Sequence, residues 1–186
     1  MSWSQWLGVS ENPRVEKLLD TLSWCHQAAA QSNQNLSSAA LMLNASGGAT
    51  FEHCVASALV TLGDKHGPIG KARHMLYHET NDHIIERLED GAILPGWGND
   101  FYKKSIDPAF VPMDHLLREE YREDHHRLDE IAELIFKVKG KTIYPNAASY
   151  SGITAERIGL AVGVECLLFI ACRLPAWAKQ YGGVAS

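Results

Sequence analysis

The 186-residue sequence has no membrane-length apolar run, no internal repeat and no low-complexity tract. A helix needs roughly 20 predominantly apolar residues to cross a bilayer, and no stretch approaches that length. Acidic residues outnumber lysine and arginine, and the net charge of −5 offers no broad attraction for nucleic acid or an anionic membrane. We therefore expect neither partner.

Cysteine motifs and secretion signals are missing as well. The four cysteines, Cys25, Cys54, Cys166 and Cys172, form no CxxC pair, and each lies in an apolar or helical context. Such thiols are typically reduced and buried. The N-terminus, Met-Ser-Trp-Ser-Gln-Trp, shows neither the basic start nor the apolar stretch of a signal peptide. The expected location is the cytoplasm.

Strand-like alternation is too short to build a sheet, whereas helical periodicity is widespread. Apolar residues at helical spacing predict helices over 13–30, 36–43, 51–62, 68–88, 112–139 and 153–172, with a short continuation at 177–181. Arg173-Leu-Pro175 should interrupt the last of these, because proline removes a helix hydrogen bond. A chain of this length normally forms one domain. The prediction is a single all-α domain, residues 1–186.

Three polar turns, punctuated by glycine and proline, separate these helices. They read Gly63-Asp-Lys-His-Gly-Pro68, Gly96-Trp-Gly-Asn-Asp-Phe-Tyr-Lys-Lys-Ser-Ile-Asp-Pro108 and Thr142-Ile-Tyr-Pro-Asn-Ala-Ala-Ser-Tyr-Ser-Gly152. The second belongs to a stretch, residues 91–111, without a convincing helix, and a connection that long is more often functional than idle. We expect the three turns to meet and form a site.

In this order the turns resemble the C-terminal portion of the citrate synthase family, which includes the citryl-CoA lyases and a domain of ATP-citrate lyase. The family carries Gly-x-x-His-Gly-Gly, then Gly-x-Gly-His with a later Asp-Pro-Arg, then Tyr-Pro-Asn-Val-Asp-Phe-Tyr-Ser-Gly. The resemblance runs from about Leu41 to Trp177 and leaves residues 1–40 as unassigned helix. It implies a citrate synthase-like multi-helical domain, truncated at the N-terminus relative to the family.

The resemblance also implies roles for individual residues. In the family one His polarises the thioester carbonyl of an acyl-CoA, an Asp removes the α-proton, and a second His acts on the partner substrate. The first His is retained as His66. The second is replaced by Asn99, which cannot transfer a proton at neutral pH, and the Asp is replaced by Ala148. Loss of a general base typically costs on the order of 10²–10⁴-fold in rate.

Three further residues match substrate- or cofactor-binding positions of the family. Arg173 resembles a carboxylate-binding arginine, whereas a second such arginine is replaced by Ala109. Asn146 belongs to the retained Tyr-Pro-Asn frame, and Lys103 lies where a basic residue meets the phosphates of coenzyme A. We expect His66, placed before a helix N-terminus, to be neutral because the helix dipole disfavours its protonated form.

Nine histidines raise the alternative of a metal site. His74, His78 and Asp82 would follow one helix face, with His83 beside them, and such a set could hold zinc. A hydrated helix face explains the same pattern, so no metal is expected. The charged segment that contains His125 and His126 predicts exposure of both.

Two functions remain open at this stage. The first is a divergent citrate synthase-like protein that binds an acyl-CoA or a small carboxylate, as a pseudoenzyme or with altered chemistry using another carboxylate such as Asp100. The second is a non-catalytic, dimeric interaction or assembly protein that reuses the fold. The apolar segment 51–62 matches a family dimerisation helix and can pack on all sides, so a homodimer is expected under both.

Overall fold

The computed structural model describes residues 2–9, 12–31 and 35–185, and this part of the chain is all-α, as predicted. It contains a 3-10 turn, Pro108–Phe110, and ten α-helices: α1 Trp3–Leu7, α2 Pro13–Ala30, α3 Leu36–Ser46, α4 Phe51–Leu59, α5 Ile69–His78, α6 Asn81–Glu89, α7 Val111–Glu120, α8 Arg122–Lys139, α9 Ala147–Arg157 and α10 Cys166–Ala185. No strand forms in these residues beyond two isolated bridges. None of the described helices is both long and apolar enough to span a bilayer.

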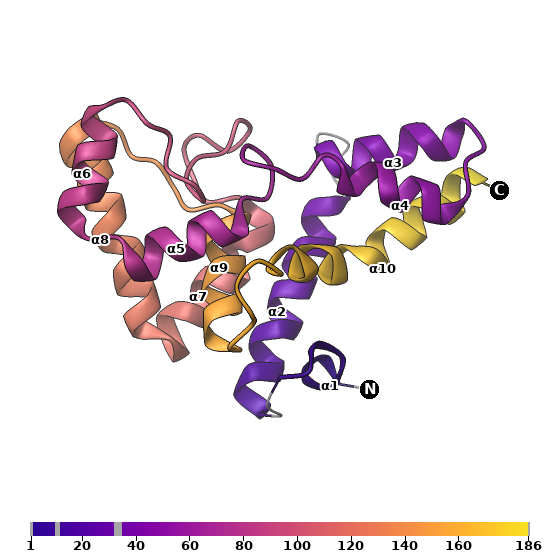
Figure 1. Cartoon of the computed structure of the whole chain (residues 1–186), viewed down its shortest axis with the longest axis horizontal. Helices are drawn as coiled ribbons and strands as arrows, with labels where there is room; N and C mark the ends of the chain where they lie inside the picture. Colours follow the sequence, from indigo (N-terminus) through magenta and orange to yellow (C-terminus); the bar gives the residue numbers. More distant parts are fainter. Residues whose placement is uncertain (1, 10–11, 32–34, 186) are drawn as a thin grey trace.

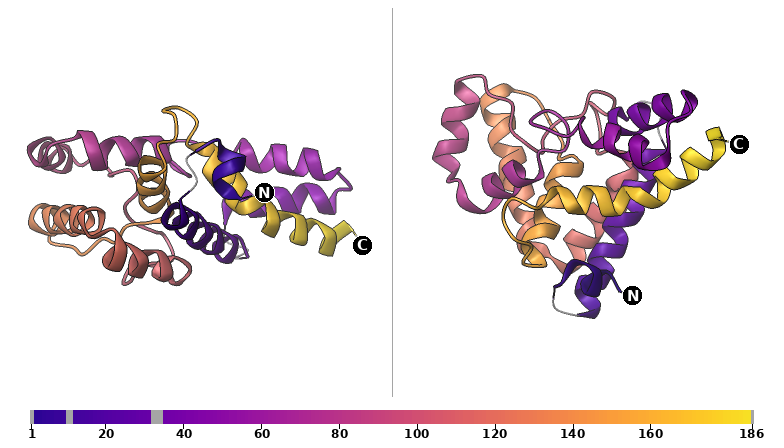
Figure 2. Two further views of the ribbon diagram at one scale, coloured as in Figure 1. Left: turned by 90° about the horizontal axis from the view of Figure 1, so that it is seen from below. Right: turned by 45° about the vertical axis from the view of Figure 1, so that its right-hand side comes forward.

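The helices form a body and an arm (Figure 1). Helices α5 to α9 make the body, in which α5 packs on α9 and α6 packs on α8. The hairpin of α3 and α4, together with the end of α10, makes the arm. Helices α2 and α10 cross between the two and pack against each other, and the views in Figure 2 show the arm projecting beyond the body.

The first long helix, α2, forms for the reason that its sequence predicts. Asn12 accepts a hydrogen bond from the backbone N–H of Arg14 at 2.8 Å, and Pro13 occupies the first helical turn. Proline is favoured there because its missing N–H has no partner in a helix start. The inner face of α2 is buried completely at Leu18, Leu22 and Cys25 and packs against the body.

Two long predicted helices are each divided into two. The prediction over 68–88 is wrong at Glu79, where the backbone is extended, and the Thr80 side chain then caps α6 by accepting from the N–H of His83. The prediction over 112–139 is wrong at Tyr121, whose φ of −130° and ψ of 54° leave the helical region. The Tyr121 hydroxyl donates to the carbonyl of Arg14 at 2.9 Å, which ties this break to α2.

The C-terminal third also departs from the predicted pattern. Helix α9 begins at Ala147, not at residue 153 or 154, because Asn146 caps it. Residues 158–165 then leave the helix, although a continuous helix over 153–172 was expected. Helix α10 in turn continues through Pro175, where an interruption was predicted. Its packing against α2, α3 and α4 holds it together across the proline.

Burial corrects one further expectation. Cys25, Cys54 and Cys172 are buried as predicted, but Cys166 is exposed. Within the chain the segment 51–62 is packed on one side, with Cys54 fully buried and Val60 83% exposed, and packing of the other side against a second subunit stays a prediction.

Candidate functional site

The three polar turns meet at one place, on the upper edge of the body in Figure 1. The turn at 96–98 pairs with the segment before α9 through a bridge between Trp97 and Pro145. The N–H of Gly98 donates to the carbonyl of Tyr144 at 2.9 Å, and the N–H of Asn146 donates to the carbonyl of Gly96 at 2.8 Å. Backbone hydrogen bonds therefore hold the second and third turns together.

Gly96 makes this close approach possible. Its φ is +85°, and a Cβ atom at this position would lie 2.3 Å from the hydroxyl of Ser149 and 3.0 Å from the side chain of Ala72. That hydroxyl donates to the carbonyl of Gly96 at 2.8 Å. A residue without a side chain is thus required both by the left-handed backbone and by the space.

A cleft of about 1600 Å³ opens where the turns meet. All six residues that the family resemblance singled out line it: His66, Asn99, Lys103, Asn146, Ala148 and Arg173. The fold thus brings together residues from four separate segments of the chain.

Arg173, from α10, lies at the floor of the cleft and is only 2% exposed. Its Nε donates to Nδ1 of His26 at 3.3 Å, its Nη1 donates to Oγ of Ser37 at 3.2 Å, and its guanidinium lies 4.1 Å from the ring centroid of Phe169. We call His26, Ser37, Phe169 and Arg173 the cleft floor. No described carboxylate forms an ion pair with Arg173, and burial lowers its pKa to about 9.

His66 lies in the wall above this floor. Its backbone N–H and carbonyl pair with those of Gly63, which closes the first turn, and its ring packs edge-on against Phe169. Burial, and secondarily the charge of Arg173, lowers the pKa of His66 to about 4. The imidazole is therefore neutral at physiological pH, but burial replaces the expected helix dipole as the cause. Its buried Nε2 has no hydrogen-bond partner among the described residues.

Two asparagines hold the turns in shape. Asn146 uses both ends of its side chain: Oδ1 accepts from the N–H of Ala148 at 2.9 Å, and Nδ2 donates to the carbonyl of Gly98 at 2.8 Å. Oδ1 of Asn99 accepts from the N–H groups of Phe101 and Tyr102 at 2.9 and 3.3 Å. Asn146 thus orders the site through the backbone, while Nδ2 of Asn99 has no acceptor among the described residues.

Ala148, which the family resemblance aligns with the general base, has apolar surroundings. Ala148 is 3% exposed and packs in a cluster that includes Ile69, Ala72 and Phe169. Asp100, the substitute that sequence order favoured, is exposed on the turn. Asp107 lines the same cleft and is less exposed, and burial raises the pKa of its carboxyl group.

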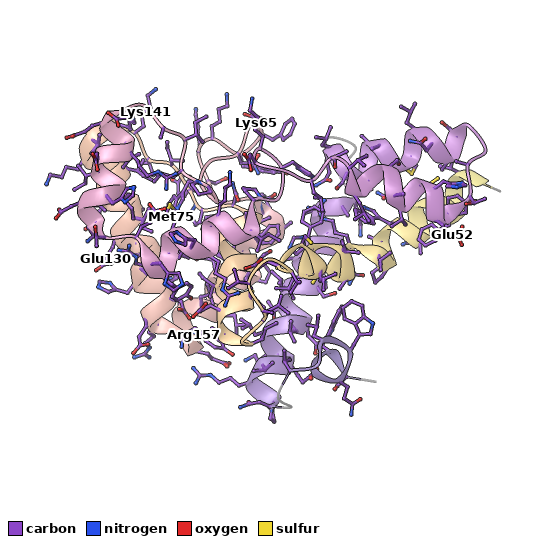
Figure 3. All side chains as sticks on the ribbon, viewed as in Figure 1. Glu52, Lys65, Met75, Glu130, Lys141 and Arg157 are labelled. Atoms are coloured by element: carbon purple, nitrogen blue, oxygen red, sulfur yellow. The ribbon has the colours of Figure 1, made fainter. Side chains whose placement is uncertain are left out.

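The cleft rim is basic and exposed. Lys65, Lys103 and Lys141 line the opening, and none of them forms an ion pair with a described residue. Lys65 belongs to the first turn and Lys141 directly precedes the third, and both lie along the upper edge of the molecule (Figure 3). We call these three lysines, with Asn99, the cleft rim.

The histidines suspected of metal binding do not form a site. His74 and His78 lie on α5, with ring centroids 5.4 Å apart, but Asp82 and His83 belong to α6 beyond the helix break. No group of three or more potential metal ligands gathers within the described residues.

His125 and His126 differ from each other in exposure. His126 is exposed as predicted, but His125 is buried between Asp114 and Asp129, with nitrogen–oxygen distances of 3.5 and 3.0 Å.

Sequence reasoning missed His26 and Asp107. His26 lies four residues after Leu22, on a helix face that the apolar spacing marks as buried, and a histidine at such a position needs a polar partner. That signal was available. The partner, Arg173, lies 147 residues away in the chain, so its identity requires the fold.

Comparisons with known proteins agree with this geometry. The family model for the citrate synthase C-terminal domain matches residues 3–182 and so includes most of the N-terminal segment that the motifs left unassigned. Citrate synthase from Corynebacterium glutamicum is 27% identical over 189 aligned positions, which cover 91% of this chain and 42% of that protein. The chain thus spans less than half the length of this relative.

Solved structures show the same fold. Citryl-CoA lyase from Hydrogenobacter thermophilus superposes with a TM-score of 0.79 at 21% identity, over 96% of this chain and 72% of that one. ATP citrate lyase from Methanothrix soehngenii, in complex with citrate and coenzyme A, gives 0.76 at 16% identity, over 97% of this chain and 32% of that one. Because the family model matches residues 3–182, nearly the whole of this chain, the chain belongs to the citrate synthase family. It has the fold of the C-terminal domain of that family.

Proposed function

We propose that this protein binds a small carboxylate or an acyl-CoA in the cleft and does not carry out the citrate synthase reaction. The observation that carries the proposal is the cleft floor, where a buried guanidinium forms no ion pair with a described carboxylate and only the more distant charge of Asp107, in the same cleft, acts on it. Burying an ion without a counter-ion is costly, so a cation kept in this state is most simply explained by an anionic ligand.

The cleft also fits the thioester end of an acyl-CoA. His66 is neutral and has an unpartnered ring nitrogen, so a ligand carbonyl can accept a hydrogen bond if that nitrogen carries the proton. Lys65, Lys103 and Lys141 supply positive charge at the opening, where the phosphates of coenzyme A would lie. A bound acyl-CoA would bring the reactive thioester, and the chain would supply its binding and orientation.

The residues for proton abstraction are not in place. An α-proton of a thioester is weakly acidic, so a base and an oxyanion partner must act together. Ala148 occupies the position of the base, and Asn99 cannot replace a histidine in proton transfer. We therefore expect no citrate formation from acetyl-CoA and oxaloacetate.

Should the protein turn over a different substrate, Asp107 is a better placed carboxylate than Asp100. Asp107 is partly buried in the cleft, and its raised pKa suits a base better than that of a fully hydrated carboxyl group. Its Oδ1 accepts from the N–H of Ala109 at 3.0 Å, which leaves Oδ2 without a hydrogen bond from the described residues.

A second candidate function rests on the arm. Leu43 on α3 is 73% exposed, and Val60 at the end of α4 is 83% exposed. A contiguous exposed apolar patch is typical of an interface, and two such residues on one hairpin could contribute to one. We propose that the arm forms a homodimer, and that the protein is an assembly protein if the cleft binds nothing.

Calorimetric titration with citrate, coenzyme A and acetyl-CoA, combined with sedimentation, separates these functions. Cleft binding predicts saturable heat with citrate or acetyl-CoA, and weaker binding in His66→Ala and Lys103→Ala. No heat and no thermal shift with any of the three ligands would contradict the binding function, and a dimer under those conditions would favour the assembly function. Formation of citrate by the wild-type protein would contradict the proposed loss of activity.

A further inference from the structure

The buried histidine beneath the cleft, His26, can adopt only one protonation pattern. A guanidinium only donates, so Nδ1 of His26 must accept the hydrogen bond from Nε of Arg173 at 3.3 Å. The ring proton is then on Nε2, which lies 2.9 Å from Oγ of Ser151. That hydroxyl donates in turn to the carbonyl of Ala147 at 2.8 Å. The direction of every bond in this chain is thus fixed.

The surroundings of His26 keep its ring neutral. The ring is fully buried and makes T-shaped contacts with Phe110 and Phe169. The centroid of the His26 ring lies 5.3 Å from the centroid of each of these two rings. The groups that face it from α9 and α10 are the Ser151 hydroxyl and the Arg173 cation, and no carboxylate forms an ion pair with it among the described residues. Burial and the arginine charge both lower the pKa of His26 well below its ordinary value.

The side chains that hold Arg173 are neutral, and this affects how much of its charge a ligand can use. A buried arginine is ordinarily paired with a carboxylate, which fixes its orientation but also cancels its charge. Here the orientation of Arg173 is fixed by a neutral imidazole, a hydroxyl and an aromatic face. The positive charge is therefore held in place without a direct ion pair, and Asp107, which lines the same cleft, is the carboxylate that acts on it from a greater distance.

We propose that His26 is a positioning residue of an anion site: it orients Arg173 through a neutral acceptor and so leaves the arginine charge available to a carboxylate of the ligand. This inference rests on the proposed carboxylate binding and gives it a mechanism. It also assigns a functional role to α2, outside the three turns that line the cleft.

Two near-isosteric variants test the role of the neutral acceptor. In His26→Gln the side-chain oxygen can still accept from Arg173, whereas in His26→Glu it accepts and also neutralises the charge. With citrate as the probe, we expect His26→Gln to bind within about fivefold of the wild type and His26→Glu to lose on the order of 10–100-fold, the range of one charge-assisted contact. His126→Glu, an exposed site on α8, controls for net charge.

A merely structural role for His26 predicts a different pattern. The citrate affinity of each variant would then follow its stability. His26→Glu gains a buried ion pair, so its melting temperature could equal or exceed that of His26→Gln. In that case His26→Glu would bind citrate at least as tightly as His26→Gln. Tight citrate binding by a folded His26→Glu variant would overturn the inference.

A measurement without ligand distinguishes failure of this inference from failure of the proposed function. Long-range proton–nitrogen NMR spectra of the wild type should show His26 as the neutral Nε2–H tautomer at the ordinary histidine pKa of about 6.5 and above, since burial lowers its pKa well below that value. An imidazolium or an Nδ1–H tautomer would contradict the inference even if citrate binds. A wild type that binds no citrate would contradict the proposed function, whatever the tautomer.

Discussion

The cleft floor and the cleft rim contribute to one cavity but are built in different ways. The floor consists of buried side chains from α2, α3 and α10, and Arg173 is fixed there on three sides. The rim consists of exposed lysines and Asn99 on turns, and its lysines form no ion pairs among the described residues. The positive charge at the floor is thus buried and held by hydrogen bonds, whereas the positive charges at the rim are exposed to solvent.

This difference assigns a separate task to each region. A charge–charge interaction is much stronger in a buried environment than in water, and exposed charges are screened over about 8–10 Å by physiological salt. The floor should therefore decide which ligand binds and how it is oriented. The rim should mainly raise the rate at which an anionic ligand arrives.

The largest effect should come from the glycine that joins the second and third turns. In Gly96→Ala the new Cβ would clash with Ser149, and the left-handed backbone would be strained. Overpacking typically costs about 1–3 kcal/mol and a left-handed alanine about 1–2 kcal/mol, so we expect an unfolding free energy lower by roughly 2–5 kcal/mol. Thermal and denaturant melts measure it.

Gly91→Ala is a matched control for that variant. Gly91 has a φ of +84°, but a Cβ there would meet nothing within 4 Å. Only the backbone cost of about 1–2 kcal/mol should remain. Equal losses in the two variants would show that the contact between the turn and α9 is not tight.

Removal of the floor charge should have the next largest effect. Arg173→Met keeps the length of the side chain but abolishes the charge-assisted contact with a ligand carboxylate. We expect citrate affinity to fall about 100-fold, or roughly 2.7 kcal/mol, by calorimetry. Arg122→Met, which removes an exposed charge from α8, should leave the affinity unchanged. A loss of similar size in both would refute the special role of the floor.

The histidines at the floor and in the wall above it should also make stability depend on pH. The pKa values of His26 and His66 are lower in the folded protein than the ordinary value of about 6.5, so the unfolded chain binds more protons below that pH. The contribution of the neutral histidines to the unfolding free energy is then fully present above about pH 6.5. It is lost as the pH falls toward about 4, the pKa of His66 in the folded protein. A tenfold difference in proton affinity between the folded and unfolded chains corresponds to about 1.4 kcal/mol, or roughly 3–6 °C in Tm at this chain length.

Melting curves over the range from about pH 4 to 8 measure this dependence. His66→Gln should flatten the decline below the ordinary histidine pKa of about 6.5, because the residue that must be buried neutral is gone. His126→Gln, at an exposed site, should leave the decline as it is. A wild-type Tm that is constant over the range would contradict the neutral, buried state of both histidines.

The smallest effect should come from the rim. Lys103→Ala should weaken acetyl-CoA binding about two- to fivefold at low salt, and the difference should shrink as salt is added, because an exposed pair is worth about 0–1 kcal/mol. Lys179→Ala, an exposed lysine of α10 that does not line the cleft, is the control. A salt-independent loss in Lys103→Ala would mean that the rim contact is buried.

The sequence predicted much of this arrangement. Glycine, proline and polar residues marked the three turns, and apolar spacing identified the all-α class and the helix that ends at Ala30. The match of the turns to one family placed His66, Asn99, Lys103, Asn146, Ala148 and Arg173 in a common site, and all six line one cleft. Local patterns sufficed there because each motif lies within one short segment.

What the sequence could not provide depends on long-range contacts. Tyr121 breaks a helix while its hydroxyl bonds to Arg14, and His26 acquires its role only where α2 meets α10. Asp107 looked like part of a turn motif, and its raised pKa follows from burial that the fold creates. The start of α9 at Ala147 was missed although the signal, an asparagine cap, was present.

The most direct test observes the floor arginine while a ligand binds. In the NMR spectrum of the 15N-labelled protein, the Nε–H signal of Arg173 should shift saturably as citrate is added. The Nε–H signal of Arg157, already paired with Asp124 at 2.6 Å on another part of the body, should not move. An Arg173 signal that stays unchanged while citrate binds, or that shifts only together with Arg157, would contradict a carboxylate site at the cleft floor.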